Sequence, residues 1–311
     1  MSFSRDLRFD PAAGTVVRRP PGDGYGYWAG GHKVSYDPHS GLFVLYYRLR
    51  TPLEAGRGGV CRVAVGDDGI RFDDVWEAHK QDLAAESIEV GHCVRHDEDE
   101  WRLYVSYERA GQPGHWRIDV LRGAEPALLD TQGRRTVLEP GMFGKTFIKD
   151  PWVRRREGGG YDLYATTNPR EGARVEGRLV RTAANEETVL AESADGLYFP
   201  TIDHVFAPAL DGSWHGQRSR LNCLVDMGDV LVGAYDGSRT FYDNYEEACG
   251  LVTSPDGRTF ARVPTEGPWV TSAHGAVRYV HGLRVGDRIF WYYEYTVEDG
   301  SHDLRVAIVD L

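Results

Sequence analysis

The apolar positions of this chain occur in short runs that alternate with polar positions and stop at turn residues. Aromatic-rich runs span residues 42–47, 101–105, 161–164, 230–235 and 288–293. Short runs of β-branched and aromatic side chains are typical of strands. Apolar residues at helical spacing are scarce, and only residues 81–88 could form a turn or two of helix. The pattern predicts an all-β protein.

Each aromatic run follows a short strand-like segment and a polar turn, which gives five similar units. The preceding segments are residues 32–36, 92–95, 152–154, 222–225 and 279–281. An Asp-Gly turn also recurs, in residues 66–72, 193–199 and 254–260. Glycine there accepts the positive φ that a tight turn demands. Units repeating every 50–65 residues or so are typical of the blades of a propeller.

We therefore predict a single domain, residues 1–311, folded as a five-bladed β-propeller of four-stranded blades. The fifth unit ends on a third strand, at residues 304–309, so we expect residues 14–19 to supply its fourth strand and close the ring. Closure removes the exposed edges of an open array of sheets. A β-sandwich is the alternative.

In such a propeller, the entries of the inner strands and the loops after the second strands share one face. These loops are long and polar, which predicts that the functional site is a funnel on this face. They span residues 48–59, 108–115, 166–178, 236–250 and 294–303.

The composition excludes some classes of binding partner. A net charge of −11 argues against binding a nucleic-acid backbone, and the chain has no apolar run long enough for a membrane helix. The N-terminal residues lack a secretory pattern, and the four widely spaced cysteines match no metal motif. We expect a soluble, cytoplasmic protein with reduced cysteines and a partner that is neither a polyanion nor a membrane.

One stretch, residues 147–153, carries a carboxylate directly before a proline. Because Pro151 cannot donate to a sheet ladder, it belongs at the start of a strand, which places Asp150 at a strand entry. The alternative is an aspartate that caps a turn.

The repeat pattern and the Lys149-Asp150-Pro151 entry resemble the five-bladed propeller glycosidases, the group of families 43, 32, 62, 68 and 130. The resemblance covers most of the chain as architecture. It implies that Asp150 corresponds to the third-blade aspartate that tunes the acid in family 43. It also implies that His274-Gly275 corresponds to a His-Gly pair that helps hold a metal in the central channel.

Two entries depart from the family-43 pattern. Ala29-Gly30-Gly31-His32 has no carboxylate where the family has its base, and Arg218-Ser219-Arg220-Leu221 has no glutamate where it has its acid. Glycoside cleavage needs a proton donor and a second carboxylate. The catalytic candidates are Asp150, Glu89, Asp236 and Glu247. For the last two, the alternative is a carboxylate that orders its loop by pairing with Arg239 or Arg258.

Further funnel residues are expected to bind substrate or metal. Histidines could hold a divalent metal, Ca²⁺ or Zn²⁺, in the central channel, or they could be hydrogen-bonded structural residues. The metal candidates are His92 and His274. Guanidinium groups suit an acidic sugar, or they could pair the funnel acids. The substrate-binding candidates are His32, Lys33, Arg48, Arg57, Lys149, Trp152, Arg278, Glu294 and His302.

These residues predict a glycoside hydrolase-like enzyme that cleaves or transfers a glycosidic bond in a small oligosaccharide or glycoconjugate. Two alternatives stay open. The same fold could hold a histidine-lined metal for non-hydrolytic chemistry, or it could be a carbohydrate-binding propeller without catalysis.

Overall fold

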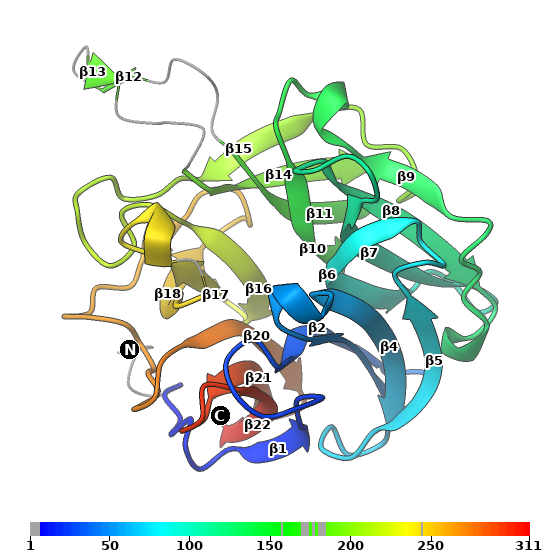
Figure 1. The fold of residues 1–311 in the computed structure, drawn as a ribbon, viewed down its shortest axis with the longest axis horizontal. Coiled ribbons are helices and arrows are strands. Elements are labelled where there is room, and N and C mark those ends of the chain that lie inside the picture. The colour runs from blue at the N-terminus through cyan, green and yellow to red at the C-terminus, as the bar shows by residue number, and fades with distance from the viewer. Residues whose placement is uncertain (1–6, 157, 169–173, 176–177, 180–184, 244) are drawn as a thin grey trace.

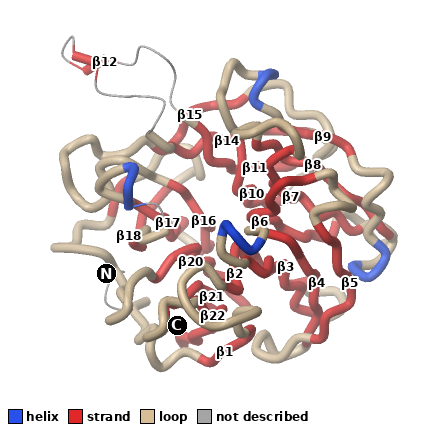
Figure 2. The backbone as a smooth tube through the Cα atoms, in the orientation of Figure 1, coloured by secondary structure: helices blue, strands red, loops and turns tan. Residues whose placement is uncertain are grey.

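Strands build almost the whole molecule. The structure, a computed structural model, describes residues 7–156, 158–168, 174–175, 178–179, 185–243 and 245–311. In this part of the chain the only helices are four short 3-10 turns, η1 to η4 (Leu53–Ala55, Pro126–Leu128, Pro140–Met142 and Phe241–Asp243), and they lie between strands in Figure 2. None of the described helices is long and apolar enough to cross a membrane.

Three sheets contain four strands each. One is β6–β9 (Ala85–Arg95, Trp101–Arg109, Trp116–Gly123, Arg135–Leu138). The next is β10, β11, β14 and β15 (Ile148–Arg155, Tyr161–Thr167, Glu187–Ser193, Ile202–Phe206), and the third is β16–β19 (Arg220–Asp226, Leu231–Gly237, Ala248–Ser254, Ala261–Arg262). A separate two-stranded sheet pairs β12 (Arg174–Val175) with β13 (Arg178–Leu179).

The remaining eight strands form two antiparallel groups that meet at one contact. The first group is β2–β5 (Trp28–Asp37, Leu42–Arg50, Gly58–Gly66, Asp73–His79). The second is β20–β22 (Val277–Val285, Arg288–Thr296, His302–Asp310) with β1 (Thr15–Arg18), which pairs with β22. A single parallel pair, Trp28 with His302, joins the two groups.

Five inner strands surround a common centre. Figure 1 shows β2, β6, β10, β16 and β20 closest to this centre, with the later strands of each sheet farther out. Each inner strand pairs with the aromatic strand that follows it, as the sequence predicts. The predicted helix at residues 81–88 is wrong: residues 81–84 form a turn, and β6 begins at Ala85.

The three Asp-Gly turns lock neighbouring sheets together. The carbonyl oxygens of Gly69, Gly196 and Gly257 each accept a hydrogen bond from a buried tyrosine hydroxyl of the adjacent sheet. The donors are Tyr292, Tyr104 and Tyr164, at 2.7, 2.9 and 2.8 Å. All three glycines have φ between 72° and 77°, a conformation that costs glycine little. The same recurring turn that marks the repeat therefore also fixes the sheets against one another.

Candidate functional site

Every inner strand contains a β-bulge near its start. The register breaks occur at residues 30–33, 88–91, 149–152, 221–223 and 278–281. A bulge turns side chains away from the ladder and toward a new direction. At three equivalent positions the backbone has positive φ: Gly31 (57°), Asp150 (58°) and Tyr279 (53°). For aspartate and tyrosine this conformation is strained, and such strain clusters at functional sites.

Asp150 is buried at the bulge of β10, where one of its carboxylate oxygens contacts cations and the other has no hydrogen-bond partner among the described residues. Its Oδ2 lies 3.3 Å from Arg220 Nη1 and 4.0 Å from Lys149 Nζ. Its Oδ1 has no hydrogen-bond partner among the described residues. The backbone amide of Asp150 donates to Ser106 Oγ (3.1 Å), and that hydroxyl donates to the carbonyl of Val90 (2.9 Å). Ser106 thus ties the bulge of β10 to the bulge of β6.

Arg220 connects Asp150 to a second buried carboxylate, Asp236. Arg220 Nη2 lies 2.8 Å from Asp236 Oδ2, and its guanidinium lies 4.1 Å from the centre of the Tyr279 ring. The backbone amide of Tyr279 donates to Asp236 at 3.1 Å. Burial raises the pKa of Asp236, against the opposing effect of Arg220. Asp236 therefore holds Arg220 and the strained Tyr279 backbone in place.

Glu247 lies among three arginines. Its oxygens contact Arg218 Nη1, Arg278 Nη1 at 2.9 Å and Arg220 Nη2 at 3.5 Å. Burial alone would raise the pKa of Glu247, but these guanidinium groups, Arg278 first, hold it well below its usual range. Glu247 is a fixed negative charge at neutral pH.

Glu89 is the corresponding acid on β6. Its Oε2 accepts from Arg48 Nε at 2.9 Å, and its Oε1 lies 4.0 Å from Arg50 and 3.9 Å from Arg57. Burial opposes ionisation, but the arginines lower the pKa of Glu89 to about 2. Glu89 is ionised at neutral pH.

Glu294 closes the network between β2 and β21. It lies 2.8 Å from Arg278 Nε and 3.1 Å from His302 Nδ1, and it accepts the amide of Gly31 at 2.7 Å. Despite burial, Arg278, His302 and Arg48 hold its pKa well below the usual range. A Cβ atom on Gly30 would lie 2.0 Å from Glu294 Oε1, so glycine is required there.

The structure therefore brings most predicted funnel residues into one ionic network. The members are Glu89, Asp150, Asp236, Glu247, Glu294, Arg48, Arg57, Lys149, Arg278 and His302. The prediction missed Arg218 and Arg220. The signal for them was the Arg218-Ser219-Arg220 entry itself, which puts two cations where the family pattern expects an acid. The alternative pairing of Glu247 or Asp236 with Arg258 is wrong, because Arg258 pairs with Glu192 and Asp203.

A cavity of about 610 Å³ adjoins this network. Its lining includes Trp116, Lys149 and Glu186, and Glu186 pairs with Arg218 at 2.8 Å. Lys149 Nζ and the Arg57 guanidinium lie 5.5 and 5.2 Å from the Trp116 ring. Their side chains are 20 and 27% exposed, so they can meet a ligand that the fully buried arginines cannot. The cavity is the accessible part of the candidate site.

Lys33 and His32, two of the predicted substrate-binding residues, are buried on β2. Burial lowers the pKa of Lys33 to about 8, opposed by Cys223, Asp236 and Asp150. Burial and the charge of Lys33 lower the pKa of His32 to about 3, so its imidazole is neutral.

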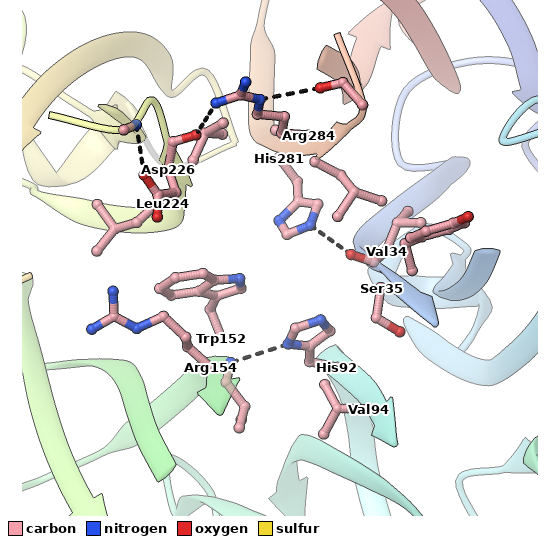
Figure 3. A pocket seen from close by; sticks show the side chains of 17 residues that line it. Val34, Ser35, His92, Val94, Trp152, Arg154, Leu224, Asp226, His281 and Arg284 are labelled. Carbon is pink, nitrogen blue, oxygen red and sulfur yellow. Dashed lines mark hydrogen bonds between the residues drawn. The ribbon is translucent and has the colours of Figure 1, made fainter. Parts of the chain in front are cut away.

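The two metal candidates do not share a site. His92 is buried against His281, whereas His274 is exposed on a turn where its amide donates to Ser272 Oγ. The described residues contain no group of three or more His, Cys, Asp or Glu side chains that could hold a metal ion. Trp152 and His92 line a different cavity, at the opposite ends of the inner strands, which Figure 3 shows. Residues 169–173 and 176–177 of the loop predicted at residues 166–178 lie outside the described residues.

No family model matches the chain, and no curated protein sequence matches it. Solved structures do resemble it in fold. A β-1,2-mannobiose phosphorylase from Listeria innocua in complex with β-1,2-mannobiose superposes with a TM-score of 0.63, at 13% identity, over 94% of this chain and 93% of that chain. A GH43_1 enzyme from Xanthomonas citri in complex with xylose gives a TM-score of 0.65, at 13% identity, over 94 and 90% of the two chains. The RS223 β-xylosidase gives 0.64, at 12% identity, over 94% of each. The fold is thus one that glycoside hydrolase and phosphorylase propellers share.

Proposed function

We propose that this chain is a five-bladed propeller closed by β1 and that it is a carbohydrate-active enzyme acting on a glycosidic bond of a small oligosaccharide or glycoconjugate. The pairing of β1 with β22 and the tyrosine contacts between neighbouring sheets support the closed ring. The resemblance of the whole chain to propeller enzymes that act on sugars supports the class. The four cysteines are free and buried, which supports a reducing, cytoplasmic location.

The free oxygen of Asp150 carries the proposal. Glu89, Glu247 and Glu294 are each held between two or three cations or hydrogen-bond donors, and these contacts keep them ionised. Asp150 Oδ1 is buried, unpartnered and presented by a strained backbone. A buried carboxylate oxygen without a partner is costly, so the position indicates an oxygen kept for a substrate.

We assign separate roles to the neighbouring acids. Asp150 is the carboxylate that meets the reacting sugar, and the ionised Glu89 stabilises positive charge that develops at the sugar ring. Glu246, on the loop between β17 and β18, has its pKa raised by partial burial and by the charge of Glu247, against the opposing charge of Arg278, and is the candidate proton donor. An acid and an ionised carboxylate are the pair that glycoside cleavage requires.

The test is turnover of a panel of aryl glycosides and short oligosaccharides by the wild type and Asp150→Asn. A matched control is Asp162→Asn, because Asp162 is also buried and paired, with Arg154 at 2.6 Å and Arg156 at 3.0 Å, but outside the network. We expect turnover to fall by about 10²-fold or more in Asp150→Asn and to persist in folded Asp162→Asn. Equal turnover in wild type and Asp150→Asn would remove Asp150 from the chemistry. A wild type that binds sugars from the panel and turns none over would favour the non-catalytic binding propeller.

A second candidate function is glycoside cleavage by inorganic phosphate. The favouring observation is that two partly exposed cations, Lys149 and Arg57, both contact the ring of Trp116, which lines the accessible cavity with Lys149. Such cations suit a phosphate that replaces water as the attacking group. Product analysis with and without phosphate distinguishes the two: a sugar phosphate indicates phosphorolysis, and a free sugar in both conditions indicates hydrolysis.

A further inference from the structure

A second cavity, of about 680 Å³, lies at the other ends of the inner strands. This cavity is separate from the ionic network. On each inner strand, the residues that line the cavity come after the start of the β-bulge, whereas the inner-strand residues of the network lie at or before it. All five inner strands contribute to it: Val34 and Ser35, His92, Trp152, Leu224 and His281. Its volume suits a small molecule.

His92 presents a free N–H group in this cavity. Its Nδ1 accepts a hydrogen bond from the backbone amide of Val153 at 3.0 Å. A neutral imidazole carries one proton, so that proton is on Nε2. Burial and the charge of Lys33 lower the pKa of His92 to about 3, which keeps the ring neutral. His92 is 4% exposed, and its Nε2 has no hydrogen-bond partner among the described residues.

Trp152 contributes an indole N–H group to the same cavity. Its indole packs against Tyr164 on one side, with the ring centres 5.1 Å apart. Figure 3 shows its nitrogen directed toward the middle of the cavity, where the rings of His92 and His281 meet edge to face. Figure 3 draws no hydrogen bond between this nitrogen and the other lining residues. His281 is already engaged, since its Nε2 lies 2.9 Å from the carbonyl oxygen of Val34.

The guanidinium groups at the edge of this cavity already have partners. Arg154 Nη2 lies 2.6 Å from Asp162 Oδ2. Arg284 Nη1 donates to the backbone carbonyl of Asp226 at 2.9 Å. The donors left for a ligand are therefore the uncharged N–H groups of His92 and Trp152. A ligand here must supply hydrogen-bond acceptors and need not carry a charge.

We propose that this cavity is a second ligand site, distinct from the funnel, and that it binds an uncharged sugar. Hydroxyl oxygens of the sugar accept from His92 Nε2 and Trp152 Nε1. The C–H groups of the sugar ring pack on the indole and on Val94 and Leu224, which also line the cavity. The site does not depend on turnover at Asp150.

The test is isothermal titration of the whole protein with glucose, mannose, xylose and arabinose, and with glucuronate and inorganic phosphate as charged comparisons. Trp152→Phe removes one N–H donor and keeps an aromatic ring. Trp76→Phe is the matched control, because the Trp76 indole donates to the carbonyl of Leu129, outside this cavity. Asp150→Asn separates binding here from binding in the funnel.

We expect a neutral sugar to bind wild type and Trp76→Phe alike, and Trp152→Phe about 3- to 10-fold more weakly, the effect of one lost hydrogen bond. In the Asp150→Asn background, Trp152→Phe should weaken binding by the same factor. The ¹⁵N signal of His92 Nε2 should shift on sugar addition, which a purely structural effect of Trp152→Phe would not produce. Three results would each overturn the proposal. They are no binding of the neutral sugars at about 50 mM, binding lost only in Asp150→Asn, and preference for glucuronate or phosphate.

Discussion

Replacing Glu247 with glutamine should test whether the buried ionic network holds the five inner strands together. The carboxylate is 2% exposed and contacts three arginines, Arg218, Arg220 and Arg278. Glutamine keeps the size of the side chain but removes the charge, so three buried guanidinium groups lose a shared anion. Removing one partner of a buried ion pair costs about 3–5 kcal/mol. We expect the free energy of unfolding to fall by about that amount.

The assay is urea unfolding at neutral pH, followed by tryptophan fluorescence, with Glu192→Gln as the matched control. Glu192 also pairs with arginines, Arg156 at 2.7 Å and Arg258, but its side chain is 41% exposed. Exposed pairs contribute about 0–1 kcal/mol, so the control should stay within that range. If Glu247→Gln unfolds at the same urea concentration as Glu192→Gln, the network does not stabilise the fold as the geometry indicates.

Two further predictions concern the pH dependence of stability. The pKa of Glu89 is lowered to about 2 in the folded protein, so its contribution is present above the unfolded pKa of about 4.3 and is lost as the pH falls toward 2. Glu89→Gln should therefore destabilise the protein by about 3 kcal/mol at neutral pH and by progressively less in acid, as measured by urea unfolding across this window. The pKa of Lys33 is lowered to about 8, so the unfolded chain binds more protons between about 8 and 10.4, and stability should rise with pH there. Lys33→Met should remove that rise and stabilise the protein at neutral pH. A variant less stable than wild type would contradict this, because it would mean that interactions of the buried ammonium outweigh the cost of its burial.

The strand pattern could be predicted because the local signals and the tertiary structure agree. Aromatic strands alternate with turns that contain Asp-Gly, and the structure uses these turns twice, to reverse the chain and to receive a tyrosine hydroxyl from the next sheet. The helix expected at residues 81–88 was wrong because residues 85–95 continue as β6, whose buried positions are fixed by pairing with β7. Pairing of this kind is not visible in a window of eight residues.

The candidate site could be predicted only in part. The entry position of Asp150 followed from the proline after it, and Asp236, Glu247 and Glu294, which were predicted from the ends of the second strands and the loops after them, all lie in the ionic network. The sequence does not show which arginine faces which acid, because that depends on the order of the sheets around the centre. Trp152 and His92 were assigned to the funnel, but a bulge displaces the residues that follow it, and both line the opposite cavity.

The pairing of the acids decides which of them can take part in chemistry. An arginine beside a buried carboxylate stabilises its ionised form, and several arginines make that form permanent across the physiological range. Glu247 and Glu294 are held in this way, and so they serve as anchors for guanidinium groups at the bulges. Asp150 differs because Arg220 is shared with Asp236 and reaches only one of its oxygens. The arginines at the β16 entry, where the family pattern expects an acid, therefore leave one oxygen of Asp150 without a partner, and we propose that this oxygen meets the substrate.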